Sequence, residues 1–288
     1  MSDEYSPDME KNGELGAGEE KQKFKFFAGR RPLSLDEKKS AKIAFGVVIG
    51  CLVMVLLHFL YFTIRYTYSD WLCILIYAML FIAPGYLANA GMLIWGGKGP
   101  PLDLGHVCKD GRRLFGEGKT WRGFLLGPIA FAVPISILIH VILYLTWPDI
   151  EGAAHAFIAD PNVTYDFYAT ADALIADLKL YILGSSTGEP DMATFLILLP
   201  RIILCAFGAA FGDLFGSWAK RRKGLERGAP FWVVDQLDFI SGCFLLTLPL
   251  LVGNFHFHTF VFLLLFTPSL TVIANTISYF TGHKKVPW

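Results

Sequence analysis

The residues best suited to chemistry gather in one stretch of the sequence, residues 208–242. The first part of this stretch is apolar, yet it carries four polar or charged residues at helical spacing: Asp213, Ser217, Lys220 and Arg221. A helix of 3.6 residues per turn places these side chains on one face. Asp235 and Asp238 follow, three residues apart and just before the next apolar run. Carboxylates beside cations are suited to holding a metal ion and a polyphosphate.

Each of these features has a simpler interpretation when it is taken alone. Asp235 and Asp238 could merely compensate the positive end of the helix that follows them. The basic residues 220–223 could mark the cytoplasmic side of a membrane protein. Asp213, however, lies inside an otherwise apolar segment, and its combination with the other two features favours a binding site.

A second polar stretch covers residues 96–123 and reads GGKGPPLDLGHVCKDGRRLFGEGKTWRG. Its glycines and prolines predict turns, whose backbone N–H groups approach phosphate oxygens closely. Four basic residues could neutralise those phosphates: Arg112, Arg113, Lys119 and Arg122. A plain charged loop is the alternative. GEGKT is not a P-loop, because Arg113 stands where the first glycine of that motif is required.

The composition indicates a membrane protein. Of the 288 residues, 54% are hydrophobic and 17% are charged, which is too apolar for an ordinary soluble domain. We therefore predict an all-α, polytopic transmembrane helical bundle with about six spans, each near bilayer length. The predicted spans are residues 43–64, 71–94, 123–147, 193–215, 239–254 and 257–280.

Lysine and arginine residues indicate how the chain lies in the membrane. Almost all of them fall in the N-terminal tail, the 95–122 and 216–238 loops and the C-terminus. The 148–192 segment has only Lys179 among eight acidic residues. We expect both termini and both basic loops on the cytoplasmic side of the cell membrane, and the acidic segment outside.

Three parts are expected along the chain. Residues 1–42 form a cytoplasmic tail, whose acidic beginning is typical of a disordered segment. The tail's KQKFKFF tract suits an anionic membrane surface better than nucleic acid, so no nucleic-acid partner is expected. Residues 43–65 form an extra N-terminal transmembrane helix, for which Ser34 and Glu37 have capping-box spacing. Residues 71–282 form the main membrane domain.

Polar residues within the predicted spans and the outer loop complete the pattern. Asn89 follows Pro84 and Gly85, which can kink or open a helix, and it faces either an aqueous cavity or a neighbouring helix. Arg201 is expected to snorkel or to find an internal partner. The outer acidic loop, residues 148–192, contains one apolar-rich stretch at 171–183 that is suited to an interfacial helix.

The two polar stretches together resemble a known family. Gly212-Asp213, Ser217, Lys220-Arg221 and Asp235-Gln236-Leu237-Asp238 are similar to the C-terminal signature of CTP-dependent phosphatidate cytidylyltransferases. The similarity is fuller to their archaeal relatives, the CDP-archaeol synthases. It also includes Pro84 with Ala88-Asn89, the Pro100–Asp103 turn, Asp110–Arg113 and Gly118–Gly123. The bacterial signature has a His-Gly-Gly between its halves, which this chain lacks.

The resemblance implies that CTP and an isoprenoid-ether phosphatidic acid, archaetidic acid, give CDP-archaeol and pyrophosphate with Mg²⁺. It implies Asp213 and Asp235 as metal ligands, with Asp238 in support. Lys119, Lys220 and Arg221 are implied as the catalytic cations. The residues implied in nucleotide or phosphate binding are Asn89, Asp103, Arg112, Arg113, Thr120, Arg122 and Ser217.

Two rival functions stay open. A CTP-dependent polyprenol kinase would transfer the γ-phosphoryl group and release CDP in place of pyrophosphate. A small anion transporter would carry charges at the bilayer midplane and inverted repeats. This sequence shows its charges in loops and no convincing internal repeat, which favours the cytidylyltransferase.

Overall fold

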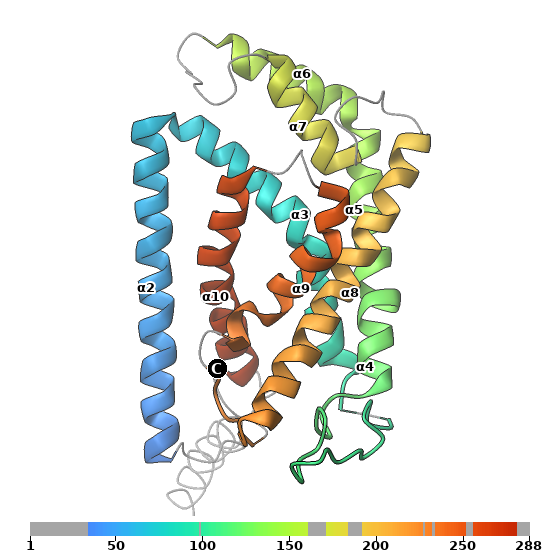
Figure 1. The fold of residues 1–288 in the computed structure, drawn as a ribbon. Coiled ribbons are helices and arrows are strands. Elements are labelled where there is room, and N and C mark those ends of the chain that lie inside the picture. The colour runs from blue at the N-terminus through green and yellow to red at the C-terminus, as the bar shows by residue number, and fades with distance from the viewer. Residues whose placement is uncertain are drawn as a thin grey trace, which may run out of the picture. The chain divides into compact units, whose positions relative to one another are not determined.

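The computed structural model describes residues 34–97, 99–160, 171–183, 192–226, 228–231, 234–251 and 256–280. The chain divides into two compact units, residues 1–45 with 272–288 and residues 46–271. Every regular element in the described ranges is a helix, as expected for an all-α fold (Figure 1). In chain order the helices are α2 (Leu35–Arg65), α3 (Tyr68–Trp95), α4 (Trp121–Leu126), the π-helical η1 (Gly127–Ala132), α5 (Val133–Leu145), α6 (Trp147–Ala159), α7 (Ala171–Leu183), α8 (Met192–Arg222), α9 (Val234–Leu251) and α10 (Phe257–Phe280).

Five described segments are long and apolar enough to cross a membrane. They are α2, α3, the continuous run Trp121–Leu145, the Leu198–Arg222 part of α8, and α10. Five of the predicted spans are confirmed, and the protein is an all-α multi-pass membrane protein. The sixth, predicted at 239–254, corresponds to α9, which begins at Val234 and is described to Leu251. Residues 252–254 lie outside the described residues, so this span stays a prediction.

The first described helix begins as its sequence predicts. The Ser34 N–H donates to Glu37 Oε2 over 2.8 Å, and the Glu37 N–H donates to Ser34 Oγ over 3.2 Å. This reciprocal pair is the predicted capping box, and it satisfies two donors that the helix itself leaves unpaired. The segment predicted to be disordered and the predicted membrane-surface tract both precede residue 34 and lie outside the described residues.

Glycines allow α8 and α9 to approach closely. Gly208, Gly212 and Gly216 recur every fourth residue of α8, so they form one stripe along that helix. A Cβ on Gly208 would lie 2.6 Å from the carbonyl oxygen of Gly242 on α9. A Cβ on Gly216 would lie 3.1 Å from the Cβ of Asp238. Backbones in contact through small residues are a common way of packing helices in membranes, and here the contact holds Asp238 against α8.

Helix α3 packs against this pair and is helical through Pro84. A Cβ on Gly85 would lie 2.6 Å from Cys243 Sγ, so the absence of a side chain there allows α9 to come close. The Tyr86 and Phe239 rings pack with their centroids 5.4 Å apart. Asn89 lies one turn further along α3 and is partly buried. The helix therefore runs without a break past Pro84 and brings Asn89 toward the α9 side of the bundle.

The segment between α5 and α8 contains two helices. The stretch predicted at 171–183 is the helix α7. Arg201 on α8 is buried, and its Nη1 donates to the carbonyl oxygen of Leu180 in the last turn of α7 over 2.8 Å. Of the two expectations for Arg201, the internal partner is therefore confirmed. His256 Nε2 lies 2.6 Å from Oδ2 of Asp177 on α7.

Candidate active site

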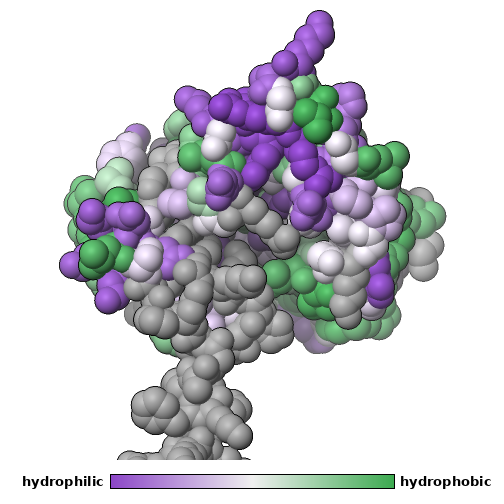
Figure 2. Space-filling model, turned by 90° about the horizontal axis from the view of Figure 1, so that it is seen from below, coloured by the Kyte–Doolittle hydropathy of each residue, from purple (hydrophilic) through white to green (hydrophobic). Residues whose placement is uncertain are grey.

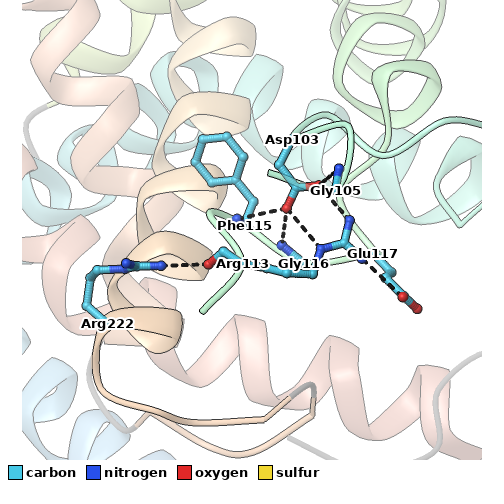
Figure 3. A network of polar contacts seen from close by, with 7 residues as sticks. All are labelled: Asp103, Gly105, Arg113, Phe115, Gly116, Glu117 and Arg222. Atoms are coloured by element: carbon cyan, nitrogen blue, oxygen red, sulfur yellow. Dashed lines mark hydrogen bonds and ion pairs between the residues drawn. The ribbon is translucent and has the colours of Figure 1, made fainter. Parts of the chain in front are cut away.

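Residues 99–120 form an irregular loop centred on Asp103. This carboxylate is 5% exposed and accepts hydrogen bonds from the backbone N–H groups of Gly105 (3.1 Å), Phe115 (3.2 Å) and Gly116 (3.0 Å). Arg113 Nη2 donates to it over 2.6 Å. Figure 3 shows these groups surrounding the carboxylate. The resemblance implied a nucleotide contact for Asp103. In the structure both of its carboxylate oxygens instead accept hydrogen bonds from within the loop.

The same bonds keep Asp103 charged. Burial acts to raise the pKa of the Asp103 carboxyl, but the hydrogen bonds from Arg113, Gly116, Gly105 and Phe115 outweigh burial and hold this pKa well below its ordinary value. Arg113 also pairs with Glu117 at 3.0 Å, so its guanidinium links two carboxylates within one loop. Gly116 has a φ of +107°, which L side chains rarely adopt. The positive φ of Gly116 and the ion pairs of Arg113 therefore both stabilise the turn at residues 113–117.

Lys119 stands where the loop ends and α4 begins. Its carbonyl oxygen accepts from the Leu102 N–H over 2.7 Å. Thr120 is buried as the N-cap of α4, and its Oγ1 accepts from the Gly123 N–H over 3.2 Å. Thr120 was expected to contact nucleotide or phosphate, and its observed contact is this cap. The cap fixes the backbone immediately after Lys119.

The Lys119 side chain reaches α8. Its ammonium forms an ion pair with Oδ2 of Asp213, 94 residues later in the sequence. Both side chains are about a quarter exposed, at 27% and 26%, so the pair is open to solvent on one side. This contact joins the two polar stretches of the sequence.

A second lysine–carboxylate pair joins α8 to α9. Lys220 Nζ lies 2.7 Å from Asp235 Oδ1. The other oxygen of Asp235 accepts from the Phe231 N–H over 2.9 Å. Asp235 lies in the first turn of α9, where a negative charge stabilises the helix. The simpler interpretation of Asp235 as a helix-start residue is thus true of the structure, and it coexists with the ion pair.

Asp238 completes the carboxylate group. One of its oxygens accepts from the Phe239 N–H over 2.6 Å. The negative charges of Asp213 and Asp235 act on its carboxyl, so the three acidic residues share one electrostatic neighbourhood. Within the described part of the chain, no three His, Cys, Asp or Glu side chains form a set arranged to hold a metal ion. Asp213 and Asp235 are each paired with a lysine, and these ammonium groups supply the positive charge.

The donor chemistry of this group nevertheless fits Mg²⁺. Carboxylate oxygens are the hard ligands that this ion prefers, and it is typically bound through one or two carboxylates plus substrate phosphates. Asp213 and Asp235 provide two such groups beside a solvent-open face. A lysine ammonium can leave a carboxylate by side-chain rotation alone, because its charge is carried on a flexible four-carbon stem.

Three other residues were expected at the site. Arg221 on α8 lies beside the loop, since a Cβ on Gly116 would be 3.9 Å from its Nε. That Nε is buried and has no hydrogen-bond partner among the described residues. Ser217 is partly buried on α8. Arg122 has its guanidinium 5.6 Å above the Trp95 ring at the end of α3, a cation–π contact.

Arg112 contacts the end of α8. Its Nη1 donates to the Arg222 carbonyl oxygen over 2.7 Å. Arg222 returns the contact by donating to Asp110 Oδ1 over 2.7 Å and to the Arg113 carbonyl oxygen over 2.6 Å. Sequence reasoning matched Asp110 to the family motif without giving it a role, and it missed Arg222. Arg222 is one of three basic residues in the last turn of α8, and nothing local to the sequence distinguishes it from its neighbours.

Seen from below in Figure 2, this end of the molecule gathers hydrophilic residues, with hydrophobic residues around them. Charged loops at one end of an apolar helical bundle are the features of an integral membrane protein. The chain belongs to the CarS-like CDP-archaeol synthase family, whose model matches residues 71–185 and 169–288. The protein is thus an enzyme of the CTP-dependent cytidylyltransferase class.

Relatives in that family share about a third of their residues with this chain. The CDP-archaeol synthase of Thermococcus kodakarensis is 34% identical over 218 residues, covering 76% of this chain and 99% of that protein. The one from Methanococcoides burtonii is 36% identical over 209 residues, covering 71% and 99%. A solved structure described as an intramembrane enzyme for archaeal membrane lipid biosynthesis is 26% identical, covering 69% of this chain and 92% of its own, with a TM-score of 0.45.

Proposed function

We propose that this protein transfers CMP from CTP to the phosphate of an isoprenoid-ether phosphatidic acid, giving CDP-archaeol and pyrophosphate. The observation that carries the proposal is the ion pair between Lys119 and Asp213. This contact brings the glycine-rich loop, which is suited to phosphates, to the carboxylates of α8 and α9. Membership of the CDP-archaeol synthase family supports the same reaction.

The reaction needs alignment and charge neutralisation more than proton transfer. An oxygen of the lipid phosphate attacks the α-phosphorus of CTP, one P–O bond forms, and the bond to the β-phosphate breaks to release pyrophosphate. The nucleophile is already an anion, so no general base is required. What the protein must supply is a fixed approach and positive charge where negative charge develops.

The two paired lysines are suited to supply that charge. Lys119 and Lys220 are held on Asp213 and Asp235 at the solvent-open edge of the site. On binding of CTP each ammonium exchanges its carboxylate for a phosphate oxygen, and Arg221, whose Nε lacks a partner in the described structure, adds a third cation. This exchange keeps every charge compensated before and after substrate binding.

Mg²⁺ is the ion that the freed carboxylates would hold. Asp213 and Asp235 would be its protein ligands, with Asp238 beside them. Bound there, the ion would neutralise polyphosphate charge and act as a Lewis acid at phosphorus. Asn89 and Ser217, both partly buried, are the described residues that we propose for contacts to the nucleotide.

The proposal also fixes the sides of the membrane. CTP is a cytoplasmic nucleotide, so the loop at 99–120 and the α8–α9 connection face the cytoplasm. Both termini then lie on that side and α7 on the other. The positive-inside distribution of lysine and arginine supports this orientation. CTP, the lipid phosphate and the surrounding membrane lipid are the partners of the site.

One assay tests the proposed reaction. Purified protein is incubated with CTP and Mg²⁺, and with ether-linked or ester-linked phosphatidic acids. Release of pyrophosphate together with a CDP-lipid is expected, with the ether lipid preferred. Formation of CDP and a phosphorylated alcohol from a polyprenol would instead identify a kinase. Metal-stripped protein with EDTA present is expected to release no pyrophosphate.

A further inference from the structure

Three side chains join the 99–120 loop to the C-terminal end of α8: Asp110, Arg112 and Arg222. We call them the arginine clasp. From the α8 side, Arg222 Nη1 lies 2.7 Å from Asp110 Oδ1, while its Nη2 donates to the carbonyl oxygens of Arg113 (2.6 Å) and Arg112 (3.4 Å). One guanidinium therefore holds three acceptors on the loop.

The loop returns the contact through Arg112. Its Nη1 donates to the carbonyl oxygens of Arg222 (2.7 Å) and Arg221 (3.5 Å). The last carbonyls of a helix have no partner within the helix, and a cation beside them is favoured by the helix dipole. Arg112 thus acts as a C-terminal cap for α8, supplied by a segment 110 residues away.

The residue that follows α8 leaves space for the Arg112 side chain. Gly224 follows α8 with a φ of +73°, and a Cβ there would lie 2.9 Å from Arg112 Nη2 and 3.0 Å from its Cζ. Any other residue at this position would be strained and would also strike the guanidinium. The glycine therefore serves both the helix end and the approach of Arg112.

The clasp leads directly to the catalytic lysine. Arg222 holds the carbonyl of Arg113, and the side chain of Arg113 holds Asp103. Asp103 in turn accepts from the N–H groups of Phe115 and Gly116, four and three residues before Lys119 (Figure 3). An unbroken series of hydrogen bonds thus runs from the end of α8 to the turn that presents Lys119.

We propose that Arg222 is a positioning residue, which fixes the loop on α8 so that Lys119 is held against Asp213, and that Arg112 caps α8 in place of binding phosphate. The effect on turnover rests on the proposed function. Arginine is required because its planar guanidinium presents several donors in a fixed fork, whereas a lysine carries one point charge. Arg222 lies outside the family signature recognised in the sequence, where Lys220 and Arg221 are the matched cations.

The experiment compares the wild type with Arg222→Ala, Arg222→Lys and, as a matched control, Lys223→Ala. Lys223 is the next residue, is exposed, and carries the same charge. Backbone hydrogen exchange is followed at four loop N–H groups bonded within the loop: Cys108, Leu114, Phe115 and Gly116. The catalytic constant and KM for CTP are measured on the same preparations.

Both Arg222 variants are expected to exchange faster at these loop amides, with exchange in α3 unchanged. Their kcat should fall at least roughly tenfold, because a small misplacement of a catalytic group is costly, while KM for CTP changes much less. Millimolar guanidinium should partly restore loop protection and kcat in Arg222→Ala. Lys223→Ala should match the wild type in every measurement.

Three outcomes would overturn the proposal. Loop exchange that is unchanged in Arg222→Ala would show that Arg222 holds nothing. Wild-type loop exchange and kcat in Arg222→Lys would reduce the role of Arg222 to its charge alone. A fall in kcat in Lys223→Ala equal to that in Arg222→Ala would do the same. The exchange measurement does not depend on turnover, so a wild type that releases no pyrophosphate would refute the proposed reaction and leave the test of loop positioning intact.

Discussion

The ammonium of Lys119 and the carboxylate of Asp213 form an ion pair across 94 residues of sequence. Lys119 ends the glycine-rich loop, and Asp213 lies on α8 directly after Gly212, which meets α9, and its charge acts on Asp238 of α9. The pair therefore places the loop beside Asp235 and Asp238 as well. Both partners are partly exposed, which leaves room for each to exchange its partner for a phosphate or a metal ion.

Replacing Lys119 tests the phosphate side of this exchange. Lys119→Ala should weaken CTP binding or slow turnover by on the order of 1.5–3 kcal/mol, the range for a charge-assisted hydrogen bond. Affinity for the lipid should change much less, because the lost group faces the nucleotide. Steady-state kinetics with each substrate varied in turn measure both effects.

Lys109→Ala is the control for Lys119→Ala. Lys109 is exposed on the same loop, so its removal lowers the charge of the loop by the same amount. It should leave the kinetics unchanged. An equal effect from both variants would mean that the loop attracts CTP by its overall charge, and Lys119 would lose its specific role.

Replacing the aspartates tests the metal side. Asp213→Asn or Asp235→Asn should abolish turnover while the protein stays folded, and Asp238→Asn should reduce it less. A carboxamide keeps the shape of the side chain but lacks the charge that binds a divalent ion. Mg²⁺-dependent turnover and the thermal midpoint are measured together. If Asp235→Asn kept more than about a tenth of the wild-type activity, the activation barrier would have risen by only about 1.4 kcal/mol. That result would contradict the metal assignment.

Asp103→Asn tests the centre of the loop through its pH dependence. The pKa of the Asp103 carboxyl is held below its ordinary value by the hydrogen bonds it accepts, most strongly from Arg113, against the opposing effect of burial. A carboxyl with a lowered folded pKa stabilises the fold above its unfolded pKa, about 3.9, and this stabilisation is lost as the pH falls toward the folded pKa.

The stability difference between wild type and Asp103→Asn should therefore be constant at neutral pH and shrink below about pH 4. Hydrogen exchange at the Phe115 and Gly116 amides, followed over a range of pH, measures this stability difference. Asp36→Asn is the control, since the Asp36 side chain is 93% exposed. A difference that did not diminish in acid would mean that Asp103 acts by shape and not by charge.

The sequence predicts the helices well because their signals are local. Apolar runs of bilayer length predict five spans, and Ser34 with Glu37 predicts the start of α2. The sixth predicted span corresponds to α9 and stays a prediction, because residues 252–254 lie outside the described residues. What hydropathy does not encode is that α9 packs on α8 through the glycines at 208, 212 and 216.

The site was predictable in its members more than in its contacts. Helical spacing placed Asp213 and Lys220 on one face, and the family resemblance added Asp235 to them. The structure joins Lys220 to Asp235. The role of Asp103 and the pairing of Asp110 with Arg222 were not predictable. These contacts depend on how an irregular loop folds back, which follows from φ angles and side-chain geometry that no short motif specifies.

Gly212 is predicted to be the position where α8 and α9 tolerate substitution least. A Cβ there would lie 2.8 Å from the Phe239 Cα of α9, closer than real contacts allow. Gly212→Leu should force the helices apart and destabilise the protein by on the order of 1–3 kcal/mol. It should also abolish turnover, because Asp213 and Asp235 lie on the two separated helices. Thermal unfolding in detergent and pyrophosphate release measure the two effects.

Gly50→Leu provides the matched control, since nothing lies within 4 Å of a Cβ added at Gly50 on α2. The same leucine there should leave both the unfolding midpoint and turnover close to wild type. Gly212→Ala adds a graded step and should cost less stability than leucine, because a methyl group requires a smaller displacement of α9. If Gly212→Leu and Gly50→Leu behaved alike, the close contact of α8 with α9 would not be what assembles the carboxylates.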